Sequence, residues 1–380
     1  MTEFSLPQGL WLGRVWRSGI GPCVVTIRAG HVFDITSKAA PTVRDLLELP
    51  DVAGFVANFL GEDLGPLEAL QSASVEAAGD TTRLLAPCDL QAIKACGVTF
   101  ARSMVERVIE ERAAGNPALA AEIRIRVAGV IGDSLRDLVP GSAKAAEVKA
   151  LLQAEGLWSQ YLEVGIGPDA EVFTKAQPMA AVGYGASVGL HPISKWNNPE
   201  PEVVLVVNSR GQIVGATLGN DVNLRDVEGR SALLLGKAKD NNAAASIGPF
   251  IRLFDADFTL DTVRGLELSL MVTGEDGFVL QGASSMRQIS RDPADLVAQT
   301  RGRHHQYPDG FVLYCGTMFS PVQDRDGPGQ GFTHHLGDVV TISAPELGAL
   351  TNTVRLSTEA PEWQFGSGAL MRNLASRGLL

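Results

Sequence analysis

The sequence predicts an α+β fold that is rich in β-strands, and three observations support this prediction. The 41 glycines of the 380-residue chain cluster in short turns. The apolar runs between these turns are short, which is typical of strands. Apolar residues at helical spacing are confined to a few stretches, such as residues 118–155, where we expect two helices. The pattern therefore favours a sheet-rich molecule over a helical bundle.

The composition is that of an ordinary globular protein, with 45% hydrophobic and 20% charged residues. A net charge of −11 argues against nucleic acid or an anionic membrane as the main partner. The four cysteines show neither a disulfide framework nor metal-ligand spacing. No signal peptide and no membrane-spanning helix is evident in the sequence. We therefore expect a cytoplasmic protein.

The first part of the chain predicts a small unit of its own. Strands are expected over residues 10–16, 22–28 and 31–35, and helices over residues 41–49 and 66–78. Thr42 is a suitable N-cap for the first of these helices. We therefore expect a small α+β N-terminal domain over residues 1–86, followed by a catalytic domain over residues 87–380.

Two apolar runs, residues 203–207 and 212–218, flank a turn and predict a β-hairpin. A turn centred between residues 209 and 210 places Glu202 opposite Thr217. Residues that lie opposite each other in an antiparallel pair share a face of the sheet. The hairpin therefore determines which polar side chains meet at its open end.

Three carboxylates are expected to converge there. Glu200 and Glu202 are two positions apart, so on a strand they point to the same face. The same register places Glu200 opposite Gly219, and puts Asp221 on that face, diagonal to Glu200. Neighbouring carboxylates repel unless a proton or cation lies between them. Oxygen ligands suit a hard cation, Mg²⁺ first, with Mn²⁺ or Ca²⁺ as alternatives. A solvated acidic strand end is the other interpretation.

Several motifs follow in a fixed order along the chain. They are Glu200-x-Glu202, Gly215-x-x-Leu218-Gly219-Asn220-Asp221-Val222-x-x-Arg225-Asp226, Ala238-Lys239-Asp240, Gly248-Pro249, and the segments 310–317 and 336–340. In combination they resemble the fumarylacetoacetate hydrolase family, over about residues 90–355. The resemblance implies that family's mixed β-roll. It also implies that the two glutamates and Asp221 hold a Mg²⁺ or Ca²⁺ ion.

The stretch from residue 93 to 114, predicted as a strand, a turn and a helix, departs from the hydrolases of that family. Those hydrolases carry a histidine that helps to activate the attacking water, and the matching residue here is Ser103. Serine cannot take up a proton near neutral pH. The stretch instead resembles the branch of 2-keto-3-deoxy-sugar-acid dehydratases, which implies that Arg102 and Ser103 bind substrate. A surface salt bridge and a hydroxyl in the first turn of a helix are the alternatives.

The resemblance marks five further residues. Glu171 matches a catalytic carboxylate of the dehydratase branch, and Lys239 matches a lysine beside the metal. Together they would transfer protons, with the pKa of Lys239 lowered by desolvation and by the cation. Lys175, Ser285 and Thr317 are implied to bind substrate. The alternatives are a strand-end acid for Glu171, a surface lysine for Lys175 and a counter-ion of the three acids for Lys239.

Other polar features are not assigned to chemistry. Arg225 and Asp226 are expected to form a structural ion pair. The pairs His304-His305 and His334-His335 have no clear partner acids at the spacing of metal ligands, and we expect them not to be ligands. The loop over residues 320–335 is either a lid or an exposed loop.

The activity that the resemblance implies is a Mg²⁺-dependent dehydration in oxidative pentose catabolism. A 2-keto-3-deoxy-D-pentonate, such as 2-keto-3-deoxy-D-xylonate or arabinonate, would be converted to 2,5-dioxopentanoate. One alternative is an acylpyruvate or fumarylacetoacetate type of C–C bond hydrolase, which would need another base, such as Glu106. The other is a metal-binding protein without catalysis. The expected partners are a small 2-keto acid and further copies of the chain, in a homodimer or homotetramer.

Overall fold

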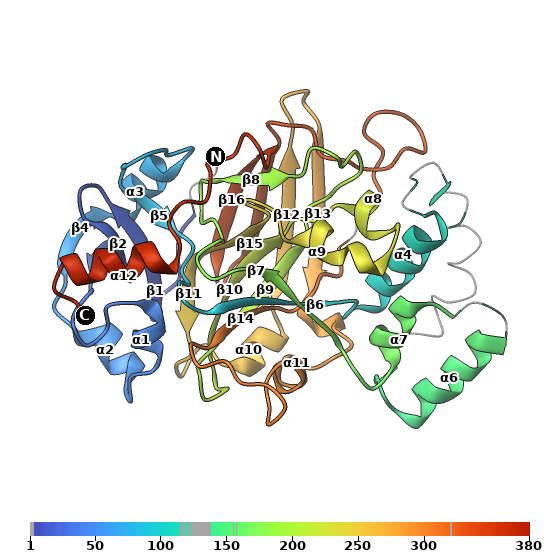
Figure 1. Ribbon diagram of the computed structural model, residues 1–380, viewed down its shortest axis with the longest axis horizontal. Helices are drawn as coiled ribbons and strands as arrows, with labels where there is room; N and C mark the ends of the chain where they lie inside the picture. The colour runs from blue at the N-terminus through green and yellow to red at the C-terminus, as the bar shows by residue number, and fades with distance from the viewer. Residues whose placement is uncertain are drawn as a thin grey trace.

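The computed structural model describes residues 4–380 except residues 115, 117–118, 121–122, 124–137, 155, 157 and 320, and the side chains of residues 101–103 and 105 are also outside the described part. Within this part, the strands form one sheet of 11 strands and one of five (Figure 1). The predicted strand-rich α+β class is therefore confirmed. The first of the two helices predicted in residues 118–155 falls largely outside the described residues.

The large sheet runs through both the N-terminal and the central parts of the chain. Its order is β4-β3-β2-β1-β11-β10-β9-β14-β6-β7, with β5 paired to β1. Neighbouring strands are antiparallel except for β14 and β6, which are parallel. The strands are β1 (Trp11–Arg17), β2 (Gly21–Arg28), β3 (His31–Asp34), β4 (Glu62–Pro66), β5 (Arg83–Leu85), β6 (Ala92–Gly97), β7 (Glu171–Ala176), β9 (Pro201–Val207), β10 (Ile213–Asp221), β11 (Ala245–Leu253) and β14 (Phe311–Tyr314).

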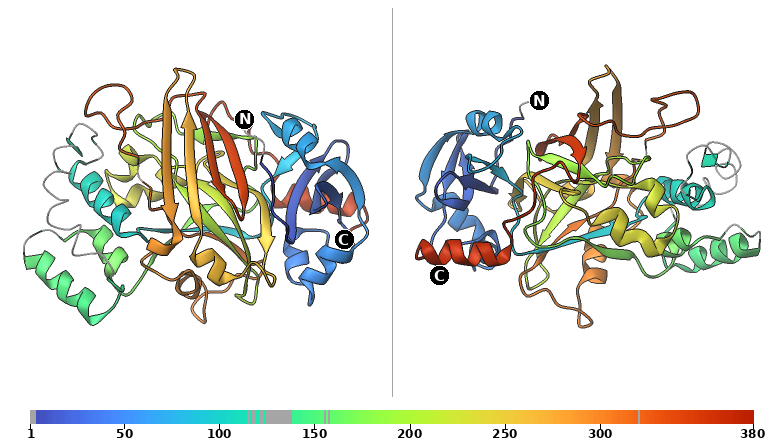
Figure 2. Two further views of the ribbon diagram at one scale, coloured as in Figure 1. Left: turned by 180° about the vertical axis from the view of Figure 1, so that it is seen from behind. Right: turned by 45° about the horizontal axis from the view of Figure 1, so that its top comes forward.

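The small sheet covers one face of the large sheet (Figure 2). In sheet order its strands are β13 (Val279–Ser285), β12 (Glu267–Thr273), β15 (Val339–Ala344), β16 (Gly348–Leu356) and β8 (Ser187–Leu190). Strand β9 is buried along its whole length, because Val203 and Leu205 pack in the core that includes the small sheet, and Val204 and Val206 pack in the core on the other face. This explains why its sequence is a continuous apolar run after Glu202.

The helices lie around the two sheets. They are α1 (Val43–Leu47), α2 (Val52–Asn58), α3 (Leu67–Ser74), α4 (Ala101–Arg112), α6 (Ala143–Ala154), α7 (Gln160–Ile166), α8 (Arg225–Glu228), α9 (Leu235–Lys239), α10 (Leu260–Arg264), α11 (Pro293–Thr300) and α12 (Ser367–Ser376), with 3₁₀ turns at Ala232–Leu234 and Met286–Gln288. Thr42 caps α1 as predicted, since its side chain accepts a hydrogen bond from Asp45 N. Helices α4, α6 and α7 share a separate apolar core at one end of the molecule (Figure 1).

The C-terminal helix α12 lies against the N-terminal strands, at the opposite end of the molecule (Figure 1). Asn373 Nδ2 donates to the carbonyl of Ile20 at 2.7 Å, and Arg377 Nη1 donates to that of Pro22 at 2.8 Å. Strand β1 also pairs with β11, so the large sheet continues from the N-terminal part into the central part. The domain boundary at residues 86 and 87 stays a prediction.

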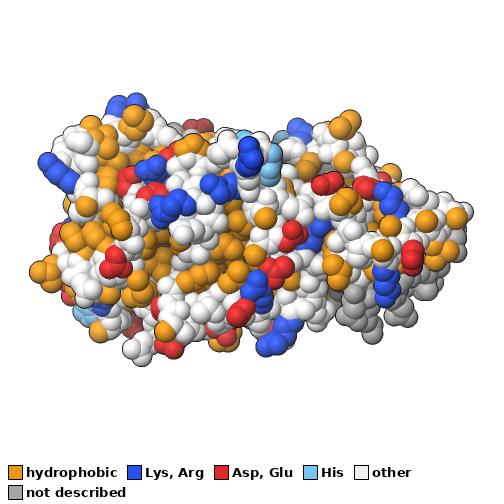
Figure 3. Space-filling view, turned by 90° about the horizontal axis from the view of Figure 1, so that it is seen from below, with side chains coloured by type: hydrophobic (Ala, Val, Ile, Leu, Met, Phe, Trp, Pro, Cys, Tyr) orange, Lys and Arg blue, Asp and Glu red, His pale blue; other side chains and the backbone are white. Residues whose placement is uncertain are grey.

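The surface shown in Figure 3 carries charges of both signs, and the cysteines form no disulfide bond. Basic and acidic side chains are interspersed over the described part of the face in Figure 3. Among the described residues, no helix has both the length and the apolar character needed to cross a membrane. All four cysteines are free and buried. A cytoplasmic location stays a prediction.

Candidate metal centre

The β9–β10 hairpin brings the three predicted acids together, but in a register two residues away from the predicted one. Glu202 lies opposite Gly219 and not opposite Thr217. The N–H of Asp221 donates to the carbonyl of Glu200 at 3.1 Å, so these two residues are directly opposed and not diagonal. A shift of two residues returns every side chain to the same face of the sheet, and the carboxylates therefore still share one face.

The turn and a bulge together explain this difference. Asn208 N donates to the carbonyl of Gln212 at 3.0 Å, which centres the turn at Arg210, later than predicted. A β-bulge between Ile213 and Gly215 then adds one more residue to β10. Either change alone would have moved the acid of β10 to the opposite face, and the two changes together restore it.

The carboxylates of Glu200, Glu202 and Asp221 form a compact and buried cluster. Each contributes an oxygen that lies within 4.8 Å of the other two, and the residues are only 4%, 2% and 2% exposed. Glycine is needed at position 219 because a Cβ there would lie 2.3 Å from Cε1 of Tyr314. The predicted convergence of the three acids is confirmed.

Two lysines supply positive charge to this cluster. Nζ of Lys239 lies 2.5 Å from Oε2 of Glu200 and 3.0 Å from Oδ2 of Asp221. Nζ of Lys175, whose side chain is fully buried, lies 2.7 Å from Oδ1 of Asp221. It also donates to the backbone carbonyls of Val222 and Lys239, at 3.1 and 2.6 Å. Both lysines therefore contact the acids, and Lys175 orients Asp221 within the protein.

The charges of the cluster are unevenly compensated. Burial works to raise the pKa of Asp221, but Lys175 and Lys239 outweigh it and hold that pKa below its usual value. Burial, Asp221 and Glu200 instead raise the pKa of Glu202 well above its usual value. Among the described residues no lysine or arginine forms an ion pair with Glu202, which accepts a hydrogen bond from Gly316 N at 2.7 Å. The cluster therefore fits a divalent cation, which would compensate this remaining negative charge.

The pKa of Lys239 changes in the opposite direction to the predicted one. Burial works to lower it, but Asp221, Glu200 and Glu228 outweigh burial and raise the pKa above its usual value. The prediction considered desolvation and a cation, whereas the structure adds three acids. Lys239 is therefore an ammonium ion, which carries a proton that it can donate and has no free lone pair to accept one.

Glu171 lies at the start of β7. Its neighbour across the sheet is Gly97, the last residue of β6. A Cβ on Gly97 would lie 2.0 Å from Oε2 of Glu171, so the glycine makes room for the carboxylate. Burial and Glu228 raise the pKa of Glu171 to about 7, against the opposing effects of Arg107 and Lys239. This carboxyl group can therefore take up or release a proton near neutral pH.

Arg107 of α4 is a component of the site that sequence reasoning missed. Its Nη2 lies 2.5 Å from Oε1 of Glu200, and its Nη1 lies 2.8 Å from a carboxylate oxygen of Glu110 and of Glu228. One feature of the sequence could have indicated that Arg107 belongs to the site. Arg107 is four positions beyond Ser103, and helical residues at that spacing lie on the same face.

The comparison with protein families agrees with this geometry. The fumarylacetoacetate (FAA) hydrolase C-terminal model matches residues 154–355, which is more than half of the chain. The chain belongs to the fumarylacetoacetate hydrolase family. The matched segment contains the β9–β10 hairpin and Lys239, so the buried acids lie within the region that the family model matches.

Two curated relatives are dehydratases. The probable 2-keto-3-deoxyxylonate dehydratase of Haloferax volcanii is 29% identical over 256 residues, which are 67% of this chain and 84% of the relative. The 2-dehydro-3-deoxy-D-arabinonate dehydratase of Saccharolobus solfataricus is 29% identical over 185 residues, which are 49% of this chain and 58% of the relative. The chain is thus similar to 2-keto-3-deoxy-pentonate dehydratases within its family.

Solved structures show the same fold. The apo form of 2-keto-3-deoxy-D-arabinonate dehydratase has a TM-score of 0.64 and 20% identity, and the match covers 91% of this chain and 99% of that chain. The enzyme complexed with magnesium and 2,5-dioxopentanoate has a TM-score of 0.63 and 21% identity, with the same coverage. At this level of identity, the likeness establishes the shared fold.

The remaining residues that the family resemblance marked are Arg102, Ser103, Ser285 and Thr317. The side chains of Arg102 and Ser103 are outside the described part of the chain, and their roles stay predictions. Ser285 Oγ donates to Oε1 of Glu267 at 2.6 Å. Thr317 directly follows the backbone N–H that binds Glu202, and its Oγ1 accepts a hydrogen bond from Phe319 N at 3.1 Å. Thr317 therefore lies beside the acids, and the substrate contacts of Ser285 and Thr317 stay predictions.

The predicted ion pair between Arg225 and Asp226 is wrong. Nε of Arg225 donates to Oε1 of Glu110 at 2.7 Å, whereas Asp226 accepts hydrogen bonds from Ser194 Oγ at 2.8 Å and Lys195 N at 2.7 Å. Successive residues of a helix point in different directions, so adjacent charges on α8 reach different partners. Through Glu110, Arg225 joins the charge network that reaches the candidate metal centre.

The loop after β14 is anchored by ion pairs. Arg325, whose side chain is 1% exposed, lies 2.6 Å from Asp338 and 3.1 Å from Asp276. His334 lies 3.1 Å from Asp338 and His335 lies 2.8 Å from Asp326. That the histidine pairs are not metal ligands stays a prediction. The role of this loop as a lid stays a prediction.

Proposed function

We propose that the protein is a Mg²⁺-dependent dehydratase that converts a 2-keto-3-deoxy-D-pentonate, such as the xylonate or arabinonate, to 2,5-dioxopentanoate in oxidative pentose catabolism. The observation that carries this proposal is the buried cluster of Glu200, Glu202 and Asp221, in which Glu202 has no cationic partner among the described residues. The two similar dehydratases support the substrate class. We propose that this 2-keto acid is the small-molecule partner of the metal centre, and that the chain forms a homodimer or homotetramer.

The three carboxylates would hold the Mg²⁺ ion, and the ion would supply positive charge that polarises the carboxylate and keto group of the substrate. The ammonium of Lys239 and the guanidinium of Arg107 hold the two oxygens of Glu200, at 2.5 Å each. Lys175 holds Asp221 from the other side. These contacts fix two of the three acids before any ligand arrives, and such preorganisation lowers the cost of binding.

Glu171 and Lys239 are the proposed proton-transfer groups. Glu171 has a pKa of about 7, so it can remove the proton from C3 of the substrate. Lys239 is protonated, so it can donate a proton to the hydroxyl group that leaves C4 as water. A second proton shift, from C5 to C3, followed by enol–aldehyde tautomerisation, gives 2,5-dioxopentanoate. The overall change is the loss of one water molecule. Ser103, Arg102, Ser285 and Thr317 are the proposed substrate-positioning residues.

C–C bond hydrolysis is the alternative function. A carboxyl group with a pKa of about 7, such as that of Glu171, is also what the activation of an attacking water would need. Glu106, the other base considered from the sequence, is buried and lies beside Arg225, with 3.6 Å between Oε2 and Nη2. The dehydratase is preferred because the two curated relatives are dehydratases.

Incubation of the purified protein with Mg²⁺ and 2-keto-3-deoxy-D-xylonate or 2-keto-3-deoxy-D-arabinonate tests the proposal. We expect the aldehyde proton of 2,5-dioxopentanoate to appear in the NMR spectrum, and Glu202→Gln to abolish its formation. Release of pyruvate from an acylpyruvate would favour the hydrolase. Mg²⁺ binding with neither product would show a metal-binding protein without these activities.

A further inference from the structure

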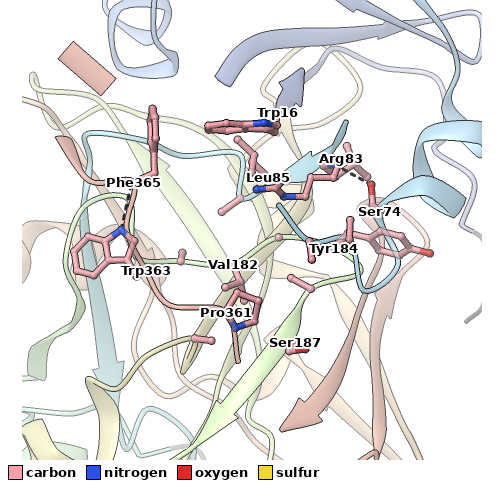
Figure 4. Close-up of a pocket in the computed structure, with 18 of the residues that line it drawn as sticks. Trp16, Ser74, Arg83, Leu85, Val182, Tyr184, Ser187, Pro361, Trp363 and Phe365 are labelled. Carbon is pink, nitrogen blue, oxygen red and sulfur yellow. Dashed lines mark hydrogen bonds between the residues drawn. The ribbon is translucent and has the colours of Figure 1, made fainter. Parts of the chain in front are cut away.

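A cavity lies away from the three acids. It has a volume of about 440 Å³ and is formed by β1, β5, the segment 179–187 and the segment 361–365 (Figure 4). None of the three acids lines it. Strand β11 separates the two sites, because Val182 at the cavity donates through its N–H to Ala245 of β11 at 2.9 Å, and Ala245 lies opposite Asp221 on β10.

Aromatic side chains form one side of this cavity. The rings of Trp16 and Phe365 meet edge to face, with centroids 5.1 Å apart and planes at 89°. Nε1 of Trp16 donates to Oδ1 of Asp80 at 2.7 Å, and Nε1 of Trp363 donates to the carbonyl of Phe365 at 3.2 Å. Figure 4 shows the three rings around one end of the cavity. Because their polar atoms already have partners, they offer fixed apolar surfaces to a ligand.

Arg83 brings a positive charge into the cavity, near the carboxylate of Asp80 but without a direct ion pair among the described residues. Its guanidinium carbon lies 5.3 Å from the ring centroid of Trp16, and it extends beneath that ring in Figure 4. Nη1 donates to the backbone carbonyls of Gly79 and Thr81, at 2.8 and 2.9 Å. Among the described residues, no ion pair and no other hydrogen bond of this guanidinium is present. Burial holds the pKa of Arg83 below its usual value, with Asp80 opposing.

The other two arginines that line the cavity, Arg14 and Arg355, have acidic partners. Nη2 of Arg355 lies 2.8 Å from Oε1 of Glu76. Nη1 of Arg14 donates to the carbonyl of Cys88 at 2.6 Å, and Nε lies 3.8 Å from Asp89. Arg83 is therefore the cation that is left to bind a ligand, since a free edge of guanidinium is suited to a carboxylate.

We propose that this cavity binds a small planar aromatic carboxylate, with its ring among Trp16, Trp363 and Phe365 and its carboxylate on Arg83. The volume lies within the usual range of sites for small molecules, roughly 300–1,000 Å³. The apolar rings provide the contact area, and the guanidinium of Arg83, which has no direct ion pair among the described residues, selects for negative charge. This ligand site is independent of the proposed dehydration, because it shares no residue with the acids.

Isothermal titration calorimetry with naphthalene-2-carboxylate and naphthalene-2-carboxamide tests the proposal. The two probes have the same ring and differ in charge. We expect the wild-type protein to bind the carboxylate at least about 10-fold more tightly, which corresponds to about 1.4 kcal/mol. We expect Arg83→Gln to bind both probes with similar affinity. Arg287→Gln is the matched control, because Arg287 is exposed and does not line the cavity.

Three outcomes would overturn the proposal. They are equal affinity of the wild-type protein for the two probes, no binding of either probe, and an unchanged preference in Arg83→Gln. If neither probe binds, and sedimentation shows an oligomer that Trp363→Ala dissociates, a second copy of the chain covers the cavity instead. Should Arg83→Gln fail to fold, the comparison of the two probes on the wild-type protein still decides.

Discussion

Nζ of Lys175 lies 2.7 Å from Oδ1 of Asp221, and neither side chain is more than 2% exposed. The other described polar contacts of Lys175 are with the backbone carbonyls of Val222 and Lys239, and its expected contact with substrate stays a prediction. A buried ion pair of this kind costs desolvation energy, so its value lies in the geometry that it fixes. Here it fixes the acid of β10 for a cation.

Replacing Lys175 by Met tests this role. Removing one partner leaves Asp221 buried with less compensating charge, and such changes cost about 3–5 kcal/mol of stability. Mg²⁺ would return positive charge to the acid, so we expect it to raise the melting temperature of Lys175→Met more than that of the wild-type protein. Differential scanning fluorimetry with and without Mg²⁺ measures both effects.

Lys94→Met is the control for this prediction. Lys94 is in β6 of the same sheet, and its Nζ donates to Thr174 Oγ1 at 2.9 Å in an exposed position. We expect little loss of stability and the wild-type response to Mg²⁺. If Lys175→Met behaved like this control, Lys175 would have no part in organising the metal centre.

Glu202→Gln is expected to stabilise the metal-free protein and to remove its response to Mg²⁺. Burial and the neighbouring acids raise the pKa of Glu202, so its ionised form is unfavourable without a cation. Glutamine has the same shape, keeps an oxygen for Gly316 N, and carries no charge. We expect a gain of about 1–2 kcal/mol from the lost repulsion. Chemical denaturation in EDTA and in Mg²⁺ measures it.

Glu147→Gln serves for comparison, because Glu147 is exposed on α6. Its neutralisation is expected to change neither the stability nor the effect of Mg²⁺. A wild-type Mg²⁺ response in Glu202→Gln would exclude this glutamate as a ligand.

Sequence reasoning predicted the acids of the hairpin because their positions follow from local rules. The two-residue repeat of a strand puts Glu200 and Glu202 on one face, and this holds in any register. The register itself depended on the turn and on the bulge after Ile213. No local pattern in the sequence predicted this bulge. The prediction for Asp221 succeeded because two errors of one residue each added to an even shift.

Contacts between distant segments could not be predicted in the same way. Arg107 and Glu200 are 93 positions apart, and they meet because α4 begins directly after a strand of the large sheet. The ammonium of Lys239 was predicted to lose its proton more readily, because the number of acids around it was unknown. Electrostatics inside a protein depends on every charge within several ångströms, which only the folded chain determines.

Activity is expected to depend on the ionisation of Glu171. Its pKa of about 7 lies above the usual value for a carboxyl group, and a bound cation would lower it. As the base, Glu171 must be ionised, so kcat/KM should rise with pH through a pKa of about 7 or below and then reach a plateau. Glu171→Gln should lose about 100- to 10,000-fold in kcat and lose this ascending limb.

The raised pKa of Glu171 also affects the stability of the folded protein. The folded protein holds the proton of Glu171 more tightly than the unfolded chain does, so this group contributes stability below pH 4.5 that is lost as the pH rises through 7. In EDTA, Glu171→Gln should therefore be more stable than the wild type at pH 8 and not at pH 4. Equal stability at both values would contradict the buried position of this carboxyl group.

The anchor of the loop after β14 should weaken in acid. Burial works to raise the pKa of Asp338, but hydrogen bonds with His334 and Arg325 outweigh it and hold the pKa at about 2. A lowered pKa contributes stability above the unfolded value of 3.8, and this is lost as the pH falls toward 2. Asp338→Asn should cost about 1–2 kcal/mol at pH 6 and progressively less below pH 4. Urea denaturation at each pH measures this difference, and a constant difference would refute the assignment.

Arg107→Lys tests whether the fork of the guanidinium is needed at the metal centre. Arg107 binds Glu200 through Nη2 and two further acids through Nη1, whereas a lysine is a single point charge on a flexible chain. We expect a loss of about 2–3 kcal/mol in stability and a weaker affinity for Mg²⁺, since Glu200 is no longer held. Arg112→Lys is the control, because Arg112 lies on the same helix and donates to the carbonyl of Gly156 at 3.1 Å. Calorimetric titration with Mg²⁺ separates the two effects, because a residue that only stabilised the fold would leave the affinity of the folded variant unchanged.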